Sequence, residues 1–306
     1  MDLRRIRYFA VLAETLHFGR AASRLNIAQP PLSQQIRVLE NELGAQLFER
    51  GNRRVELTPA GKALLPEARA LLAQADRVAA VAARAQRGEI GELRVGLTGS
   101  AAFTELIPRL ILAYRQRFPD VYLRIDELTT QAQLTALLER QLDVAIVRGI
   151  AAPDLPSTLR ATRLFEDSLV VALPPQHRLA GDPKPLSIGA LADEAFVMYP
   201  RESGTGVYDQ IISLCRQAGF APRIGQEARA AATIVGLVAA GLGVSLVPES
   251  LRSIHANGVV YRPVKDKGAR SAMWLVWPTH QPSAQQAAFA AIAKSVGAHG
   301  RETPLP

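Results

Sequence analysis

The chain has 306 residues, of which 48% are hydrophobic and 6% aromatic. This composition is typical of a folded globular protein and excludes a disordered or fibrous one. At this length two or more domains are expected. The formal net charge is +8, and residues 1 to 90 carry most of it, with 14 basic against 9 acidic side chains. Such an excess suits a polyanionic partner, but it can equally be a solvated face.

The sequence predicts a cytoplasmic protein with no membrane association. Residues 1 to 5 lead into an amphipathic pattern instead of the apolar stretch of a signal peptide. No run approaches the ~18 consecutive apolar residues of a membrane span. Cys215 is the only cysteine, so neither an intramolecular disulfide nor a cysteine-rich zinc site can form. We expect Cys215 to be a packed core thiol and not a redox sensor.

The first 45 residues predict three helices, the last two joined by a tight turn. Apolar side chains recur at helical spacing over residues 3 to 16 (Ile6, Phe9, Ala10, Ala13, Leu16). A short helical segment at 20–25 and a turn at 26–29 follow. Pro30 and Pro31 suit the first turn of a third helix, because the amide hydrogens that proline lacks have no partner there. Its buried face is marked by Leu32, Ile36, Leu39 and Leu43.

The opposite face of this third helix carries Ser33, Gln34 and Arg37. Hydrogen-bonding side chains near a helix N-terminus are the ones that reach base edges in the major groove of DNA. An ordinary polar helix face is the alternative interpretation. Residues 47–57 favour the DNA interpretation, because they read as two short strands around a Gly-Asn turn whose tip carries Arg53 and Arg54. Guanidinium groups on a protruding hairpin suit phosphate contact or minor-groove insertion.

These segments together predict a winged helix-turn-helix, and the order of their motifs resembles the LysR-type transcriptional regulators. The resemblance is carried by Ala21-Ala22 with Leu25, by Gln29 through Ile36, by Leu39-Glu40 through Leu43-Gly44, by Leu47-Phe48-Glu49-Arg50 and by Leu57 through Gly61. We expect double-stranded promoter or operator DNA as the partner. The residues predicted to contact it are Gln29, Pro30, Pro31, Ser33, Gln34, Arg37, Arg53 and Arg54.

A long helix is predicted from Thr58-Pro59 to Gly88, with Thr58 as a good N-cap, and Pro66 can bend it. A heptad seam runs along it (Leu64, Ala68, Leu71, Ala75, Val78, Ala82, Ala85), beside a second stripe at Leu65, Leu72 and Ala79. So much apolar surface cannot be buried against a small winged domain alone. A homodimer through this helix is therefore the hypothesis. Dimer and tetramer both stay open, since the family is frequently tetrameric.

From Gly91 the pattern changes to strands alternating with helices, as in an α/β fold. Strands are predicted at 92–97, 121–127, 144–147, 164–173, 195–199, 243–248 and 274–277, and helices at 104–118, 130–140, 207–218 and 234–240. The resemblance implies a two-lobed effector domain similar to periplasmic solute-binding proteins. Its crossovers between lobes would fall near 161–163 and 265–268.

The predicted domains are therefore the winged helix-turn-helix at 1–58, the linker and dimerisation helix at 59–88, and the effector-binding domain at 91–306. Within the last, lobe I takes about 91–161 and 268–300, and lobe II about 162–267.

The cleft between the lobes is the predicted ligand site, because strand ends and helix starts present unpaired amides that favour an anion. Hydroxyl residues follow the first and second strands and precede the helix at Val207. Arg148, directly after a buried strand, could pair with a carboxylate. Family members that bind aromatic or dicarboxylic catabolites use positions corresponding to Ser100, to Thr129 or Thr130, and to Arg148. The resemblance thus implies a small anionic effector. The predicted contacts are Ser100, Thr129, Thr130, Arg148, Ser203 and Thr205, and the alternative is that the hydroxyls only cap helices.

The sequence argues against two other classes of protein, an enzyme and a transport receptor. The five histidines form no metal-binding pair, and no nucleophile elbow, phosphate loop or dinucleotide fingerprint follows a strand, so no enzyme, metal or cofactor is predicted. A solute-binding protein for transport would resemble residues 91–300 on fold alone. Such a receptor would need a secretion signal and would have no use for the winged domain.

Overall fold

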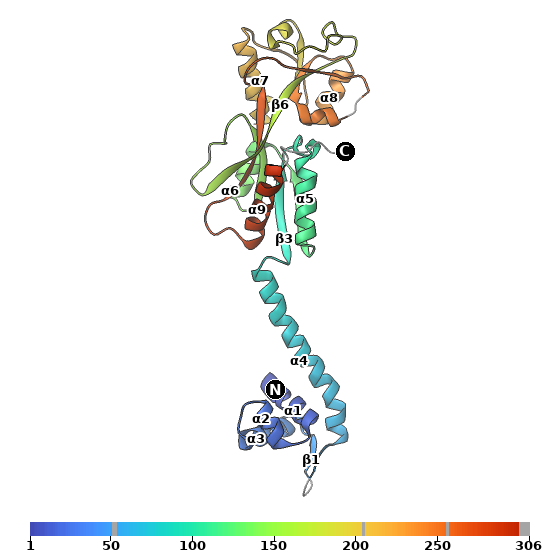
Figure 1. The fold of residues 1–306 in the computed structure, drawn as a ribbon, viewed down its shortest axis with the longest axis vertical. Helices are drawn as coiled ribbons and strands as arrows, with labels where there is room; N and C mark the ends of the chain where they lie inside the picture. The colour runs from blue at the N-terminus through green and yellow to red at the C-terminus, as the bar shows by residue number, and fades with distance from the viewer. Residues whose placement is uncertain (51–53, 204–205, 255–256, 300–306) are drawn as a thin grey trace. The chain divides into compact units, whose positions relative to one another are not determined.

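The computed structural model describes residues 1–50, 54–203, 206–254 and 257–299. The chain forms two compact units, Met1–Ala85 and Gln86–Pro306. The long helix α4, Pro59–Gln86, carries the chain from the first unit to the second (Figure 1). Within the described residues, the helices include none with the length and apolarity needed to cross a membrane.

The N-terminal unit is a three-helix domain with a two-stranded hairpin. It contains α1 (Leu3–Thr15), α2 (Phe18–Arg24) and α3 (Gln29–Leu43), then β1 (Phe48–Arg50) and β2 (Val55–Leu57), which pair antiparallel. The predicted apolar stripes meet in one core, where Phe9, Leu32, Ile36 and Leu39 are fully buried. The elements predicted from the sequence are all present.

Helix α4 packs tightly against the base of the hairpin. The Thr58 hydroxyl accepts a hydrogen bond from the Gly61 amide at 2.9 Å and donates one to the Gln46 carbonyl at 2.7 Å. A Cβ at Gly61 would lie 2.2 Å from the Leu47 carbonyl oxygen, so only glycine permits this approach. The helix then runs through Pro66 without interruption to Gln86.

The C-terminal unit is built on a seven-stranded mixed sheet in the order β10-β6-β11-β5-β3-β4, with β9 also paired to β6. Strands β3 (Gly91–Leu97), β4 (Val121–Glu127) and β5 (Val144–Gly149) are parallel, and β11 (Arg270–Pro278) is antiparallel to β5. The long β6 (Leu159–Leu173) pairs with β11 along its first part.

Helices cover both faces of this sheet. Val144 and Ile146 of β5 pack in the cluster that includes α5 (Leu106–Arg117) and α9 (Ala284–His299). Ala145 and Val147 pack in a separate cluster with α6 (Thr130–Leu138). This double burial explains why β5 is a continuous apolar run in the sequence, without alternation. The strands β3, β4, β5 and β11, the first part of β6, and these three helices are called the first lobe below.

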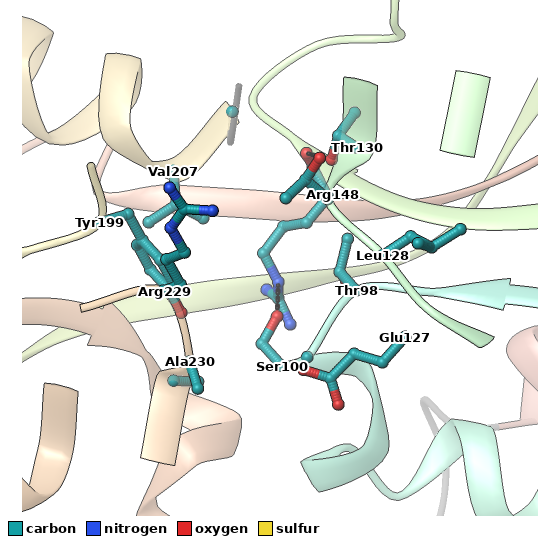
Figure 2. Close-up of a pocket in the computed structure, with 14 residues that line it drawn as sticks. Thr98, Ser100, Glu127, Leu128, Thr130, Arg148, Tyr199, Val207, Arg229 and Ala230 are labelled. Atoms are coloured by element: carbon teal, nitrogen blue, oxygen red, sulfur yellow. Dashed lines mark hydrogen bonds between the residues drawn. The ribbon is translucent and has the colours of Figure 1, made fainter. Parts of the chain in front are cut away.

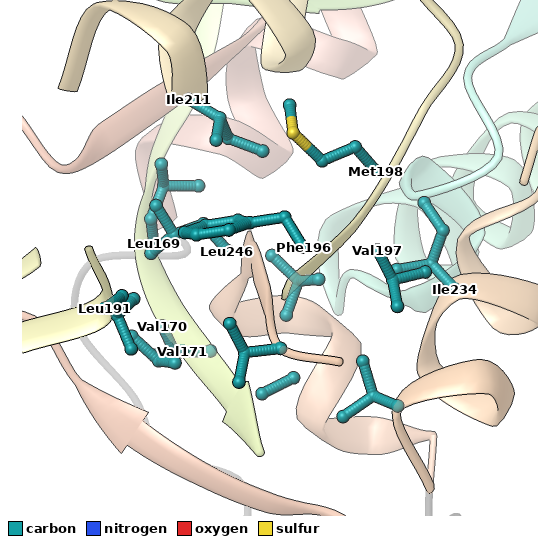
Figure 3. Packing of buried hydrophobic residues seen from close by; sticks show 14 of the residues in the cluster. Leu169, Val170, Val171, Leu191, Phe196, Val197, Met198, Ile211, Ile234 and Leu246 are labelled. Atoms are coloured by element: carbon teal, nitrogen blue, oxygen red, sulfur yellow. The ribbon is translucent and has the colours of Figure 1, made fainter. Parts of the chain in front are cut away.

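The second lobe gathers around the last part of β6, where Leu169 to Leu173 pair with β9 (Ser245–Pro248) and β10 (Val260–Pro263). A parallel pair, β7 (Ala195–Met198) and β8 (Arg223–Glu227), lies beside them with α7 (Gly206–Gln217) and α8 (Ala231–Ala239). Phe196, Val197, Ile211 and Ile234 are buried at its centre (Figure 3). Cys215 is also fully buried here, and burial raises the pKa of its thiol to about 12.

The short helices η1 (Ala101–Phe103), η2 (Ile188–Leu191), η3 (Arg201–Ser203) and η4 (Glu249–Ser253) complete the unit. One crossing between lobes lies at Ser168–Leu169 in β6, beyond the expected 161–163, because β6 is one uninterrupted strand that pairs with β11 up to Ser168. The return crossing precedes Arg270, where β11 begins. Strands β8 and β10 and helix α9 were not predicted from the sequence.

Candidate functional site

The N-terminal unit presents one exposed polar face on α3. The side chains of Gln29, Pro30, Pro31, Gln34 and Arg37 are exposed, and that of Ser33 is half-buried. The N-cap residue Ala28 makes no side-chain capping bond, and Pro30 and Pro31 carry no amide hydrogen. The start of α3 therefore offers few backbone donors, and its exposed side chains are the candidate contacts. The predicted recognition residues therefore share one accessible surface at the beginning of α3.

A buried carboxylate connects the hairpin to this helix. Glu40, on α3, accepts hydrogen bonds from the amides of Leu47 and Phe48, at 2.9 and 3.2 Å. Arg54 is exposed next to β2, whereas the predicted Arg53 lies outside the described residues. Because the first strand of the hairpin is bonded to α3, the two candidate DNA-contacting elements are held in a fixed relation. Sequence reasoning gave Glu40 no role beyond its place in a motif.

In the C-terminal unit a cavity of about 250 Å³ lies where both lobes meet. The first lobe supplies Thr98 to Ser100 after β3, Glu127 to Thr130 at and after the end of β4, and Arg148 near the end of β5. The second lobe supplies Tyr199 and the segments around the starts of α7 and α8. Figure 2 shows Arg148 between Tyr199 and Arg229 on one side and Glu127 and Leu128 on the other. Strand ends and helix starts thus converge here, as expected for α/β sheets.

Three helices begin at the wall of this cavity. Thr130 is the first residue of α6, Gly206 of α7 and Ala231 of α8, and all three line the space. The N-cap of α8, Ala230, has no side-chain capping bond. Each helix start carries roughly half a positive charge. The three helix starts consequently contribute positive potential to the cavity.

Arg148 is the most densely bonded side chain of the cavity wall. Its Nε donates to Ser100 Oγ at 2.9 Å (Figure 2), and its NH1 donates to Asp167 Oδ2 at 3.0 Å and to Ser271 Oγ at 2.9 Å. NH2 makes a longer contact, 3.5 Å, to Ser250 Oγ, which itself donates to Asp167 Oδ2 at 2.8 Å. The guanidinium therefore already holds a carboxylate of the protein.

Burial controls the ionisation of the groups around Arg148. The side chains of Arg148 and Asp167 are only 2% and 8% exposed. Burial lowers the pKa of the Arg148 guanidinium, and the neighbouring Asp167 opposes this shift. Burial raises the pKa of Tyr199 to about 12, so its phenol is neutral at physiological pH and can donate a hydrogen bond into the cavity.

The predicted hydroxyls have different surroundings. Ser100 is buried, and its hydroxyl accepts the hydrogen bond from Arg148 Nε. Thr129 caps α6 by accepting from the Ala132 amide at 3.3 Å, as the alternative interpretation proposed, and Thr130 makes a long contact of 3.5 Å to the Arg148 carbonyl. Both nevertheless line the cavity. Ser203 is the last residue of η3, and Thr205 lies outside the described residues.

Three cavity residues carry polar groups that sequence reasoning missed: Tyr199, Arg229 and Glu127. Arg229 is 80% exposed and lies 3.8 Å from Glu202. Arg229 lies between the end of β8 and the start of α8. The other candidate residues were predicted because they occupy the same kind of position, between a strand end and a helix start. Because strand β8 was not predicted from the sequence, the position of Arg229 between a strand and a helix could not be recognised.

Among the described residues no group of three His, Cys, Asp or Glu side chains could hold a metal ion.

Known protein families match both parts of the chain, the helix-turn-helix unit and the unit that holds the cavity. Residues 3–62 match the family model of the bacterial regulatory helix-turn-helix proteins of the lysR family, and residues 86–298 match the LysR substrate binding domain. The chain belongs to the LysR family of transcriptional regulators. One relative of this LysR-type regulator is the HTH-type transcriptional regulator YnfL of Escherichia coli (strain K12), 44% identical over 280 residues, or 92% of this chain and 93% of YnfL. The resemblance stated from the motifs is confirmed, and a transport receptor is not favoured.

Solved structures of the LysR family show the same architecture. Full-length CbnR complexed with its target DNA superposes with a TM-score of 0.80 at 26% identity, covering 97% of this chain and all of CbnR. The BenM effector binding domain with its effector benzoate gives a TM-score of 0.62 at 28% identity, covering 71% of this chain and 96% of that domain. The predicted fold, a helix-turn-helix unit followed by an α/β substrate-binding unit, is confirmed. Residues 86–306 are called the effector domain below.

Proposed function

We propose that this LysR-family regulator binds promoter DNA through α3 and the β1–β2 hairpin, and that a small carboxylate in the interlobe cavity controls this binding. The observation that carries the effector class is the convergence of three helix N-termini with Arg148 and Arg229 on one small space. Tyr199 and Thr98 add neutral donors, and Thr98 Oγ1 is buried without a hydrogen bond to any described residue. The benzoate in the BenM domain supports a carboxylate of this size.

The DNA-binding part of the proposal predicts the effect of Arg37→Ala. Arg37 is exposed on the same face of α3 as Gln34, and a lost arginine contact to a base edge costs ~1–3 kcal/mol. We expect affinity for the upstream DNA of its own gene to fall by roughly ten- to a hundredfold, measured by gel shift at several salt concentrations. Arg77→Ala, an exposed arginine on α4, is the matched control and should bind as the wild type does. A wild type without salt-sensitive binding would refute the proposal.

The effector part predicts that small carboxylates stabilise the protein. A ligand that binds only the native state raises the melting temperature in a concentration-dependent way. Screening aromatic and aliphatic carboxylates by thermal shift should reveal at least one such compound. Arg229→Ala should weaken its binding by about tenfold, as expected for an exposed charged contact. Arg223→Ala, an exposed arginine of β8 outside the cavity, should not. No stabilisation by any carboxylate would refute this effector class.

The regulator is further proposed to be a homo-oligomer that associates through α4. Leu64, Leu65, Ala68 and Leu72 pack on the N-terminal core, but other apolar side chains of the helix face solvent. Leu71 and Val78, both in the predicted heptad seam, are 38% and 61% exposed. A second copy of the helix would cover them and pair two recognition helices on one DNA site.

A further inference from the structure

Of the buried ion pair between Arg148 and Asp167, only Arg148 lines the effector cavity. Asp167 instead lines a separate space of about 690 Å³, which Arg148 does not line. Asp167 is on β6, Ser271 on β11 and Ser250 on η4, so the guanidinium is held by both crossing strands and by the second lobe. The protein thus supplies its own anion to the arginine that faces the ligand.

We propose that Asp167 is a specificity-determining residue: as the built-in counter-ion of Arg148, it restricts the cavity to effectors that carry a single negative charge. This inference rests on the proposed carboxylate-sensing function of the same cavity. Arginine stays protonated in proteins, and a buried charge is tolerated only when it is paired. Once paired with Asp167, Arg148 offers the ligand hydrogen bonds but no net charge.

The charges around the cavity lead to the same conclusion. The positive charge of Arg148 is balanced by Asp167 and that of Arg229 by Glu202, and Glu127 adds a negative charge to the cavity wall. The remaining positive potential comes from the three helix starts, each worth about half a charge. That potential suits one carboxylate. A second carboxylate placed against Arg148 would face Asp167 across one guanidinium, and like charges in a buried site disfavour each other's ionised form.

The test uses the purified full-length protein and the isosteric variant Asp167→Asn. Removing the counter-ion leaves Arg148 charged and unpaired, so a small anion should take its place. We expect the rise in melting temperature caused by sodium acetate, compared with sodium chloride at equal ionic strength, to be several degrees larger in Asp167→Asn than in the wild type, whose cavity already accepts a single carboxylate. In calorimetric titrations the affinity for phthalate relative to benzoate should rise at least about tenfold in Asp167→Asn, because the repelling carboxylate is gone.

Two further variants make the outcome decisive. Arg148→Met/Asp167→Asn has neither member of the ion pair and should lose the additional acetate response that Asp167→Asn gains. Asp143→Asn, which breaks the less buried pair with Arg94, should not gain it. If Asp167→Asn fails to fold but Arg148→Met/Asp167→Asn folds, the unpaired arginine is the cause, which supports the counter-ion role. If both variants fail to fold, the counter-ion role is overturned. Equal acetate responses in wild type and Asp167→Asn would also overturn it. Absence of any carboxylate binding by the wild type refutes the proposed function instead, and the acetate comparison still decides on Asp167.

Discussion

Replacing Arg148 with alanine is expected to lower the free energy of unfolding of the effector domain by about 3–5 kcal/mol. The substitution leaves the Asp167 carboxylate, 8% exposed, without its cation, and it orphans the hydroxyls of Ser100 and Ser271. An unpaired buried carboxylate must take up a proton or admit water, and either route costs free energy. The thermal or urea-induced transition of the effector domain, followed by circular dichroism in the full-length protein, measures the loss.

Arg94→Ala is the matched control for this substitution. Arg94 also forms two side-chain bonds to an aspartate, Asp143, at 3.0 and 2.9 Å in the same sheet. Its pair is 32% and 20% exposed, so water can replace the lost partner and the destabilisation should be clearly smaller. Equal losses in the two variants would show that burial does not set the cost. A large loss in Arg148→Ala alone would also mean that a failed effector response in this variant cannot be assigned to lost ligand contacts.

Arg148 also shows which features of the site could be predicted from the sequence and which could not. It was predicted as a site residue because it is a basic residue that follows a continuous apolar strand, and the structure has it among the residues that line the cavity. Its partner could not be foreseen, because Asp167 is in the middle of a strand 19 residues away and Ser271 is 123 residues away. Contacts at such separations depend on the strand order β6-β11-β5, which local patterns do not encode.

The elements missed in the effector domain share a physical cause. All five residues of β8 are exposed and the central one is Gly225, so its sequence shows no alternation of apolar and polar residues. Helix α9 is alanine-rich on every side, and small side chains such as Ala290 and Ala293 do not stand out as a stripe. The elements found correctly, such as α3 and β5, either present one large apolar face or are buried on two faces.

A double substitution in α4, Leu71→Glu with Val78→Glu, is expected to raise the dimer dissociation constant at least about a hundredfold, or ~2.7 kcal/mol. Both side chains are exposed in the single chain and one heptad apart in the proposed seam. A dimer would bring four glutamates into an apolar seam without cations, and burying unpaired charges costs several kcal/mol. Sedimentation velocity at micromolar concentration measures the change. Affinity for promoter DNA should fall with it, because a monomer carries only one recognition helix.

The control substitutions place the same charges elsewhere on the helix. Ala73 and Ala80 are exposed, also one heptad apart, and lie two positions beyond the seam residues. Ala73→Glu with Ala80→Glu therefore adds equal charge and preserves helix propensity while leaving the seam apolar, and this variant should remain a dimer. Dissociation of both variants would point to general charge repulsion, and dissociation of neither would place the interface on a surface other than this stripe of α4.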